Sequence, residues 1–345
     1  MASQDSCLLP SVSIVIPTYN SARTIAQCLE STFSQDYPSS RIERIVVDGG
    51  SKDGTLEMVS RFRIDKIIHN PLRTGEAAKA LGVLAATKEI VLLQDSDNLL
   101  DSKSWLRTMV SPFKNSEVVG SEPLFYSYRG FDSLITRYCA LLGMNDPICL
   151  YLGNYDRFSY VTGKWTSIPV ETLDFRDFLL VRLDKNNLPT IGANGFMFRR
   201  SVLPTINLGQ FLFDIDLIHT LVAKGMDHFA KVKVGIVHLF ADSFQLFARK
   251  TLRRIRDYQF YQENRMRSYP WPGFSNKRLQ WFVFSTVFTI PIARDCVKGY
   301  KARPDRAWFF HLPACWITLF IYSNLSLIEI AKTSLARNSN NASIL

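Results

Sequence analysis

The chain has 345 residues, of which 47% are hydrophobic and 21% are charged, and these proportions exclude an intrinsically disordered protein. The formal net charge of +10 indicates an anionic partner, but charge alone does not choose among nucleotide phosphates, nucleic acid and an acidic membrane surface. The six cysteines lie far apart with no C-x-x-C spacing, so we expect reduced, mostly buried thiols in a cytosolic setting rather than disulfides or zinc ligands.

The first hundred residues alternate between short apolar runs and segments with helical spacing. Helical spacing of apolar residues follows the first strand, at Ile25, Leu29 and Phe33, and a second helix is predicted over 75–87. Strands are predicted at residues 12–16, 45–47, 66–68 and 90–93. Strands separated by helices in this way favour right-handed βαβ units and a parallel sheet, and therefore an α/β fold.

The strand at 90–93 is followed directly by two carboxylates, Asp95 and Asp97. Side chains two apart on an extended chain point the same way, so we expect these carboxylates to converge beyond the strand's end, where open α/β sheets bind ligands. A hard divalent cation is the natural partner of two close carboxylates and would also hold phosphate oxygens. The alternative interpretation is a simple polar turn.

The regular pattern loosens between residues 121 and 190, which we interpret as an aromatic-rich insertion that shapes an acceptor pocket. Regularity returns at residues 192–200, a helix is predicted to open at Phe213–Leu217, and a strand is predicted over Val232–His238. We therefore expect one catalytic domain over residues 10–240.

The region from 241 to 335 combines basic and apolar segments. An amphipathic helix is predicted over Ser243–Tyr261, with one strongly basic face that either is solvated or binds anions. Two apolar runs follow, Trp281–Ile292 and Trp308–Ile328. The first is short for a bilayer span and the second carries polar residues, so we expect helices that lie in the interface of an anionic membrane. A buried helical subdomain or a dimer surface is the alternative, and residues 336–345 are predicted to be a disordered tail.

Taken together, these motifs resemble those of glycosyltransferase family 2, whose catalytic domain has the GT-A fold: a mostly parallel central sheet flanked by helices. The resemblance covers roughly residues 10–255. It depends on several short segments whose order and spacing along the chain resemble those of the family. These segments are Ile16–Asn20, Asp48–Thr55, Gly75 with Lys79, Asp95–Asp97 in the D-x-D position, and Asp214–Leu217 in the acidic catalytic position.

The resemblance implies a donor site for a nucleotide sugar. Pro17, Thr18 and Tyr19 would border the nucleobase, and Asp48 would accept the imide N–H of uracil. Further candidates for the donor are Lys79, toward the base or a phosphate, Ser96 in the D-x-D segment, Asn194 at the floor near the sugar, and Arg253 and Arg254 at the diphosphate. Lys79 is alternatively a solvent-facing lysine, and Asp53 is expected to brace its loop.

The resemblance also implies a metal ion, Mg²⁺ or Mn²⁺. Asp97 would be the main ligand, Asp95 would contact ribose or the metal, and His238 would serve the metal or the phosphates unless it is a structural histidine. Asp214 takes the position of the general base, although Phe213 stands where relatives often carry glutamate, so Asp216 is the alternative base.

The resulting prediction is an inverting hexosyltransferase that uses a UDP- or GDP-sugar and acts on a lipid-linked or polysaccharide acceptor, as in cell-envelope polysaccharide synthesis. We expect it at the cytoplasmic face of the membrane as a peripheral protein, and homo-oligomers are compatible with this expectation. A polyprenyl-phosphate sugar synthase is the alternative enzyme, and a degenerate GT-A membrane scaffold is the alternative without activity. Neither G-x-G-x-x-G nor G-x-x-x-x-G-K-[ST] occurs at the required place, which disfavours a dinucleotide-binding dehydrogenase and a P-loop NTPase. The basic helix lacks a recognised nucleic-acid module around it, so no nucleic-acid partner is expected.

Overall fold

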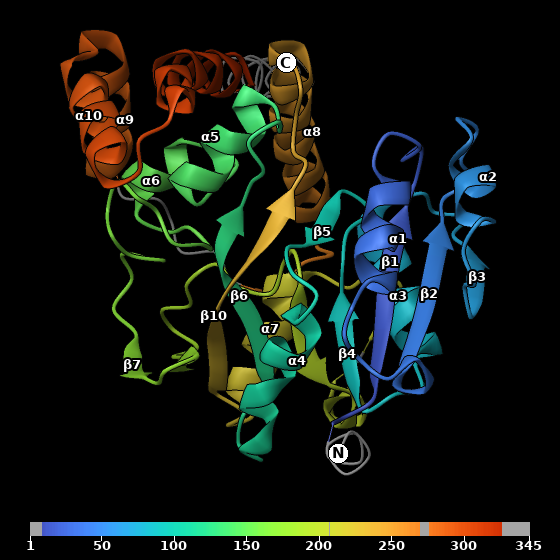
Figure 1. Cartoon of the computed structure of the whole chain (residues 1–345). Coiled ribbons are helices and arrows are strands. Elements are labelled where there is room, and N and C mark those ends of the chain that lie inside the picture. The colour runs from blue at the N-terminus through green and yellow to red at the C-terminus, as the bar shows by residue number, and fades with distance from the viewer. Residues whose placement is uncertain (1–8, 207, 270–275, 326–345) are drawn as a thin grey trace, which may run out of the picture.

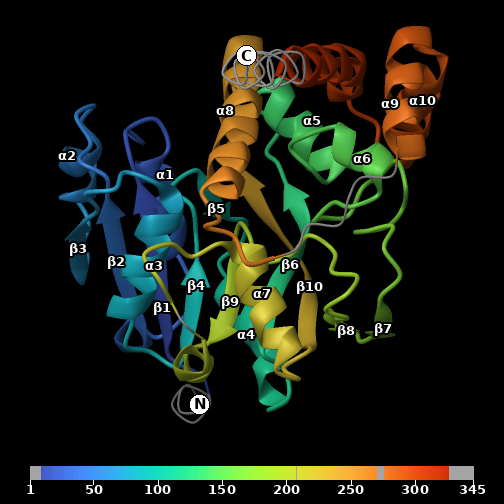
Figure 2. The same cartoon turned by 180° about the vertical axis from the view of Figure 1, so that it is seen from behind.

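The computed structural model describes residues 9–206, 208–269 and 276–325, and these residues fold around one ten-stranded sheet (Figures 1 and 2). The strand order is β3-β2-β1-β4-β9-β6-β10-β8-β7, with β5 paired to β10. The strands are β1 (Val12–Thr18), β2 (Ile42–Asp48), β3 (Lys66–His69), β4 (Ile90–Leu93), β5 (Asn98–Leu100), β6 (Gly120–Ser127), β7 (Glu171–Asp174), β8 (Phe178–Arg182), β9 (Phe196–Arg199) and β10 (His228–His238).

The predicted α/β class, with a central sheet flanked by helices, is confirmed, and the sheet combines parallel and antiparallel pairs. β3, β2, β1 and β4 are parallel, as the βαβ pattern predicted. β9 then runs antiparallel to both β4 and β6, and β8 runs antiparallel to β10. The parallel half therefore places the ends of β1, β2 and β4 at one edge of the sheet.

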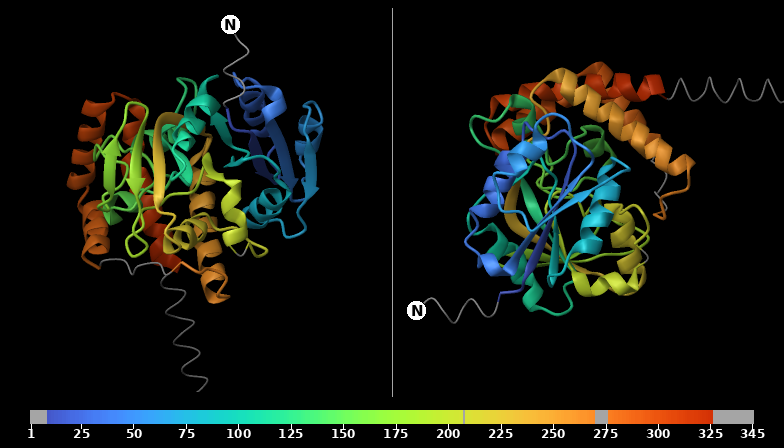
Figure 3. Two further views of the ribbon diagram at one scale, coloured as in Figure 1. Left: turned by 90° about the horizontal axis from the view of Figure 1, so that it is seen from below. Right: turned by 90° about the vertical axis from the view of Figure 1, so that its right-hand side faces the viewer.

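Helices cover both faces of the sheet, as the side view of Figure 3 shows. They are α1 (Ile25–Phe33), α2 (Thr55–Val59), α3 (Gly75–Ala85), α4 (Trp105–Val110) and α7 (Asp214–Ala223), whereas α5 (Leu134–Leu142) and α6 (Ile148–Leu152) lie with the C-terminal helices (Figure 1). Alternate residues of β1 enter separate cores: Ile14 packs with α1 and α4, and Val15 packs with α3 and α7. Gly82 of α3 allows the close approach, because a Cβ there would lie 2.3 Å from Val15 Cγ1.

The C-terminal region forms a helical layer beyond the edge of the sheet toward which β6 and β10 run (Figure 1). It contains α8 (Phe244–Glu263), α9 (Asn276–Phe288), α10 (Ile290–Ala302) and a further helix from His311 onward. Phe282, Ile292 and Cys315 form its small core with Ile148 of α6. Among the described residues, no helix combines the length and apolarity needed to cross a bilayer. The predicted tail at 336–345 and the last residues of the run to Ile328 lie outside the described residues.

The interpretation of residues 121–190 as an insertion is wrong for its first residues, because Gly120–Ser127 forms β6 in the middle of the sheet. Glu122 and Pro123 made this stretch look unlike a buried strand. Glu122 is tolerated there because it is fully buried against Lys231 of β10 and Arg157, at 2.5 and 3.1 Å.

Candidate active site

The loops after β1 and β2 are tied together at the predicted donor edge. Thr18 is paired with Asp48 in the strand register, and both strands end there. Asp48 Oδ2 accepts hydrogen bonds from the backbone N–H groups of Gly50 and Ser51, at 2.8 and 3.0 Å, and Oδ1 accepts one from Ser51 Oγ at 2.6 Å. Asp48 is only 3% exposed. Asp48 therefore organises its own loop, and its predicted contact with a nucleobase would be additional to these hydrogen bonds.

Tyr19 presents an aromatic surface beside this loop. It is 46% exposed and lies against Gly49, where an added Cβ would be 3.0 Å from the ring. The neighbouring Thr18 Oγ1 is buried without a hydrogen-bond partner among the described residues, which is uncommon for a buried hydroxyl. Asp53 braces the loop as expected, accepting hydrogen bonds from Ala22 N and from both N and Oγ1 of Thr55.

The D-x-D segment after β4 forms a turn, so the extended-strand argument for Asp95 and Asp97 was wrong. Asn98 N donates to Asp95 O at 2.9 Å, and Asn98 then begins β5. Ser96 Oγ lies 2.8 Å from Ser21 Oγ of the β1 loop. The turn sends the two carboxylates to different neighbours, because Asp95 interacts electrostatically with Lys79 and Asp214, whereas Asp97 contacts the end of β10 and α8.

Asp97 binds two basic side chains that come from distant parts of the sequence. Its Oδ2 lies 2.9 Å from Lys250 Nζ and 3.5 Å from His238 Nε2. Burial disfavours the charged carboxylate, but His238 and Lys250 outweigh it and hold the pKa of Asp97 well below its usual range. The other ring nitrogen of His238 lies 3.3 Å from Asn145 Nδ2, which orients the imidazole. Asp97 is thus a fixed carboxylate to which cations are attracted.

A three-ligand metal site made of Asp95, Asp97 and His238 is not assembled, since the described residues contain no cluster of three side chains able to hold a metal. Asp97 and His238 do converge, and they offer one oxygen and one imidazole nitrogen. Such a pair suits a Mg²⁺ or Mn²⁺ ion whose remaining ligands are substrate phosphates and water. In this structure the Lys250 ammonium contacts the same carboxylate oxygen, Asp97 Oδ2.

Asp214 and Lys79 form a close ion pair between α7 and α3. Lys79 Nζ lies 2.9 and 2.8 Å from the two carboxylate oxygens of Asp214. Burial raises the pKa of Asp214 to about 6, with Lys79 opposing the rise and Asp95 and Glu76 adding to it. Burial lowers the pKa of Lys79, but the carboxylates of Asp214 and Asp95 raise it by more. Lys79 therefore stays charged. Lys79 is not solvent-facing, and in this structure it contacts the candidate base.

Asp216, the alternative base, is occupied elsewhere. Its carboxylate accepts hydrogen bonds from Ser268 N at 3.0 Å, from Tyr269 N at 3.3 Å and from the Arg267 guanidinium at 3.3 Å. These contacts anchor the segment after α8 to the start of α7. The geometry therefore favours Asp214 over Asp216 as the base.

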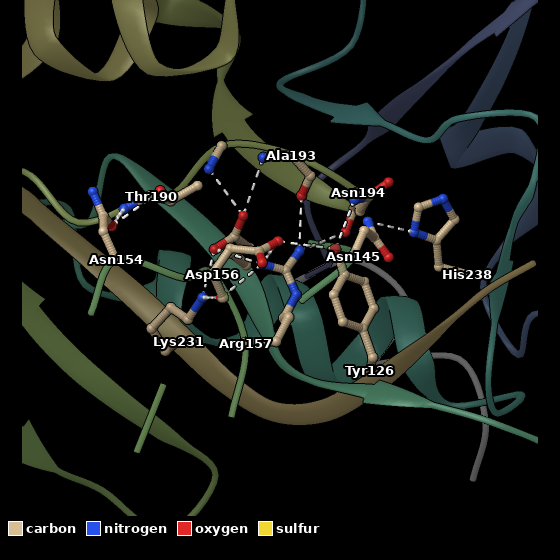
Figure 4. A network of polar contacts seen from close by, with 12 residues as sticks. Tyr126, Asn145, Asn154, Asp156, Arg157, Thr190, Ala193, Asn194, Lys231 and His238 are labelled. Atoms are coloured by element: carbon tan, nitrogen blue, oxygen red, sulfur yellow. Dashed lines mark hydrogen bonds and ion pairs between the residues drawn. The ribbon is translucent and has the colours of Figure 1, made fainter. Parts of the chain in front are cut away.

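Asn194 lies on a loop before β9 that a buried polar network supports (Figure 4). Its Nδ2 donates to the Tyr126 hydroxyl at 2.8 Å, while its Oδ1 is buried without a partner in the described part of the chain. Asn194 and Gly195 both have positive φ, 45° and 87°. Gly192 of the same loop lies against Asp214, where an added Cβ would be 3.2 Å from the Cβ of Asp214. The loop thus connects the predicted sugar floor to the predicted base.

The network that holds this loop contains residues that the sequence did not identify as functional. Glu122 Oε1 accepts hydrogen bonds from the backbone of Gly192 and Ala193, at 2.9 and 3.1 Å. Arg157 donates to the carbonyl oxygens of Ala193 and Asn194, at 2.8 and 2.9 Å. Burial lowers the pKa of Lys231, the second cation at Glu122, to about 8. No local pattern marks this cluster, because its members come from β6, β10 and an irregular segment.

The arginines predicted at the diphosphate differ in their surroundings. Arg254 lies 3.6 Å from the buried Asp146 and packs over the Phe240 ring, so it anchors α8. Arg253 is exposed. Lys250 of α8 contacts Asp97 at the site. The sequence predicted a basic face on this helix but did not single out Lys250.

Comparison with known families identifies the class of protein that carries this sheet edge. The sequence model described as Glycosyl transferase family 2 matches residues 13–206, more than half of the chain. The chain therefore belongs to glycosyltransferase family 2, as its motifs predicted.

Individual relatives match shorter segments. Glycosyltransferase AglE of Haloferax volcanii is 35% identical over 115 residues, which cover 32% of this chain and 38% of the relative. Poly(ribitol-phosphate) beta-N-acetylglucosaminyltransferase TarS of Staphylococcus aureus is 34% identical over 97 residues, which cover 27% of this chain and 17% of the relative. The chain thus spans less than half the length of both curated relatives. Among solved structures, mannosyltransferase PcManGT from Pyrobaculum calidifontis, in complex with GDP-Man and Mn²⁺, aligns with 95% of this chain and 81% of its own at 19% identity and a TM-score of 0.46.

Proposed function

We propose that this chain is an inverting glycosyltransferase that moves a sugar from a nucleoside-diphosphate donor, a UDP- or GDP-sugar, to an acceptor hydroxyl. The single observation that carries the proposal is the half-buried Asp214, held through both oxygens by Lys79 beside the D-x-D turn and with a pKa raised to about 6. A general base works best when its pKa lies near the operating pH. An ordinary aspartate, with a pKa near 4, would be a much weaker base.

In the proposed reaction, Asp214 takes the proton of the acceptor hydroxyl while the acceptor oxygen bonds to the anomeric carbon. The bond from that carbon to the diphosphate breaks, and the nucleoside diphosphate leaves with the electron pair. Lys79 holds the Asp214 carboxylate through both oxygens, so it positions the base and keeps it ionised. The Glu122 network fixes the loop between Asn194 and Gly192 against Asp214.

The donor would lie along the edge formed by the loops after β1, β2 and β4. Tyr19 offers an exposed ring to a nucleobase, and Thr18 Oγ1 and Asn194 Oδ1 are buried acceptors without partners among the described residues. Asp97 and His238 would hold a Mg²⁺ or Mn²⁺ ion, which when bound would offset the negative charge of the donor's diphosphate. Lys250 supplies positive charge at the same place.

The acceptor is proposed to be a lipid-linked sugar or a polysaccharide. The relative TarS is named for poly(ribitol-phosphate), a polymer of a sugar alcohol and phosphate, which supports a polymeric acceptor. The C-terminal helical layer supports the lipid-linked class, for the reasons given in the next section.

A donor screen tests the proposal. Thermal unfolding of the whole chain should shift upward with one class of nucleotide sugar, and the shift should increase with Mn²⁺ or Mg²⁺. The matched control is Asp97→Asn, which should lose the metal-dependent part of the shift. If no nucleotide sugar changes the unfolding temperature with or without metal, the proposed donor site is wrong.

A further inference from the structure

The helix α9 is apolar on two opposite sides. Its inner side buries Phe282, which contacts the ring of Tyr151. Its outer side exposes Phe284 and Phe288, at 45% and 57%, and these rings contact each other with centroids 4.4 Å apart. A helix at the surface of a protein in water normally turns only one side toward the core and keeps the other polar. The inner side is explained by packing within the chain, and the outer side is not.

The exposed apolar surface continues onto the neighbouring helices. Among the residues that the structure describes, 26 large hydrophobic side chains are exposed, and twelve of them lie between Leu279 and Phe320. They are Leu279, Trp281, Val283, Phe284, Val287, Phe288, Ile290, Val297, Tyr300, Phe309, Trp316 and Phe320. We call these side chains the outer helical surface. A concentration of this kind marks an interaction site, whereas single exposed apolar residues are normal.

Basic residues accompany this surface. The exposed Arg294, Lys298 and Lys301 lie on α10, and Arg303 and Arg306 follow it directly. Residues 276–325 contain only two acids, Asp295 and Asp305. Both have partners inside the chain, Tyr151 for the first and Arg137 for the second. The surface therefore combines exposed aromatic rings with an excess of positive charge.

We propose that the outer helical surface binds an anionic membrane, with its apolar side chains in the interface and its basic residues against lipid headgroups. Exposed tryptophan and tyrosine rings, together with long basic side chains, are the residue types that suit the boundary between lipid and water. A second copy of the chain fits less well, because two like-charged surfaces would face each other in a symmetric dimer. The helices would lie on the membrane.

Membrane binding would also determine the side from which the acceptor reaches the site. This consequence rests on the proposed function. The helices that carry the outer helical surface lie on the side of the molecule where β6 and β10 end (Figures 1 and 2). α8 belongs to the same layer and contacts the site directly through Lys250 and Asp97. A membrane bound there would bring a lipid-linked acceptor to the side on which the donor edge opens.

Vesicle flotation tests the binding without donor or acceptor. The full chain is mixed with vesicles of phosphatidylcholine alone, or of phosphatidylcholine and phosphatidylglycerol in equal parts. We expect the protein to float with the anionic vesicles, and high salt should release part of it. Phe284→Glu with Phe288→Glu should reduce the bound fraction about tenfold or more. The matched control is Ile67→Glu with Leu84→Glu, at equally exposed positions on β3 and α3, which should bind like the unchanged chain.

Three results would overturn the inference: no flotation with anionic vesicles, equal flotation of the α9 double variant, or equal loss in the control. Sedimentation velocity of the same proteins provides a further check. If the α9 substitutions convert a dimer into a monomer, the surface serves a second copy and the membrane proposal fails. Because the vesicles contain no sugar, failure of binding is distinguishable from failure of the proposed transfer, which a donor screen in solution measures.

Discussion

Replacing Lys79 by methionine should move the acid limb of the pH–rate profile. Lys79 contacts both oxygens of Asp214, whose pKa is about 6, while Asp95 and Glu76 are its acidic neighbours. Removing the ammonium takes away the ion pair that favours the ionised carboxylate, so the pKa of Asp214 should rise by about 1 to 3 pH units. With a rise of about 2 units, the ionised fraction at pH 7 would fall from about 91% to about 9%, roughly a tenfold loss of rate.

The assay is kcat/KM for sugar transfer measured from pH 5 to pH 9, because its acid limb reports the base of the free enzyme. In Lys79→Met the rate lost at neutral pH should return at pH 9. Lys79→Arg keeps the charge and should keep the midpoint. Glu76→Gln removes a negative charge and should move the midpoint downward, the opposite sign. An acid limb that stays in place in Lys79→Met would refute the assignment of Asp214 as the titrating base.

Three further substitutions separate the roles at the site. Asp97→Asn should abolish metal-dependent binding of the donor in calorimetry, because it removes the carboxylate that attracts cations; retained metal dependence would contradict this role. Asp216→Asn should lower the free energy of unfolding by about 1–3 kcal/mol, since an NH2 group replaces one of the two oxygens that accept from Ser268 N and Tyr269 N, while turnover stays nearly unchanged. A large loss of turnover at unchanged stability would instead make Asp216 the base. Glu122→Gln removes the carboxylate charge that the buried Lys231 and Arg157 share, leaving Asp156 as the acid beside Arg157, and should cost about 3–5 kcal/mol in urea unfolding, so an unchanged stability would be inconsistent with the network described.

Local pattern was sufficient to predict the first half of the sheet. β1 and β4 are short apolar runs that end in polar turns, and both are buried on both faces, which gives a strong signal in the sequence. The resemblance to the family, carried by the order of the motifs, also predicted that Asp48, Asp95 and Asp214 lie at one edge of the sheet. The sequence could not predict individual hydrogen bonds, for example those that Asp48 accepts from Gly50 and Ser51.

The failures come from interactions between distant segments. β6 was missed because Glu122 is polar, and only the fold shows that Lys231 and Arg157 neutralise it, 109 and 35 residues away along the chain. The turn at Asp95–Asp97 was treated as an extension of β4, because the pairing of β5 with β10 cannot be read locally. Lys250 is 153 residues from Asp97, so its role depends on how α8 crosses the site.

The most direct test of the central claim compares donor binding and sugar transfer in a single preparation of Asp214→Asn. Calorimetry with the donor found in the thermal screen measures binding, and a single-turnover assay measures transfer. If Asp214 is the base, donor affinity should be unchanged and the transfer rate should fall by about 100- to 10,000-fold. An unchanged transfer rate, or a donor affinity that is lost together with the rate, would contradict the account.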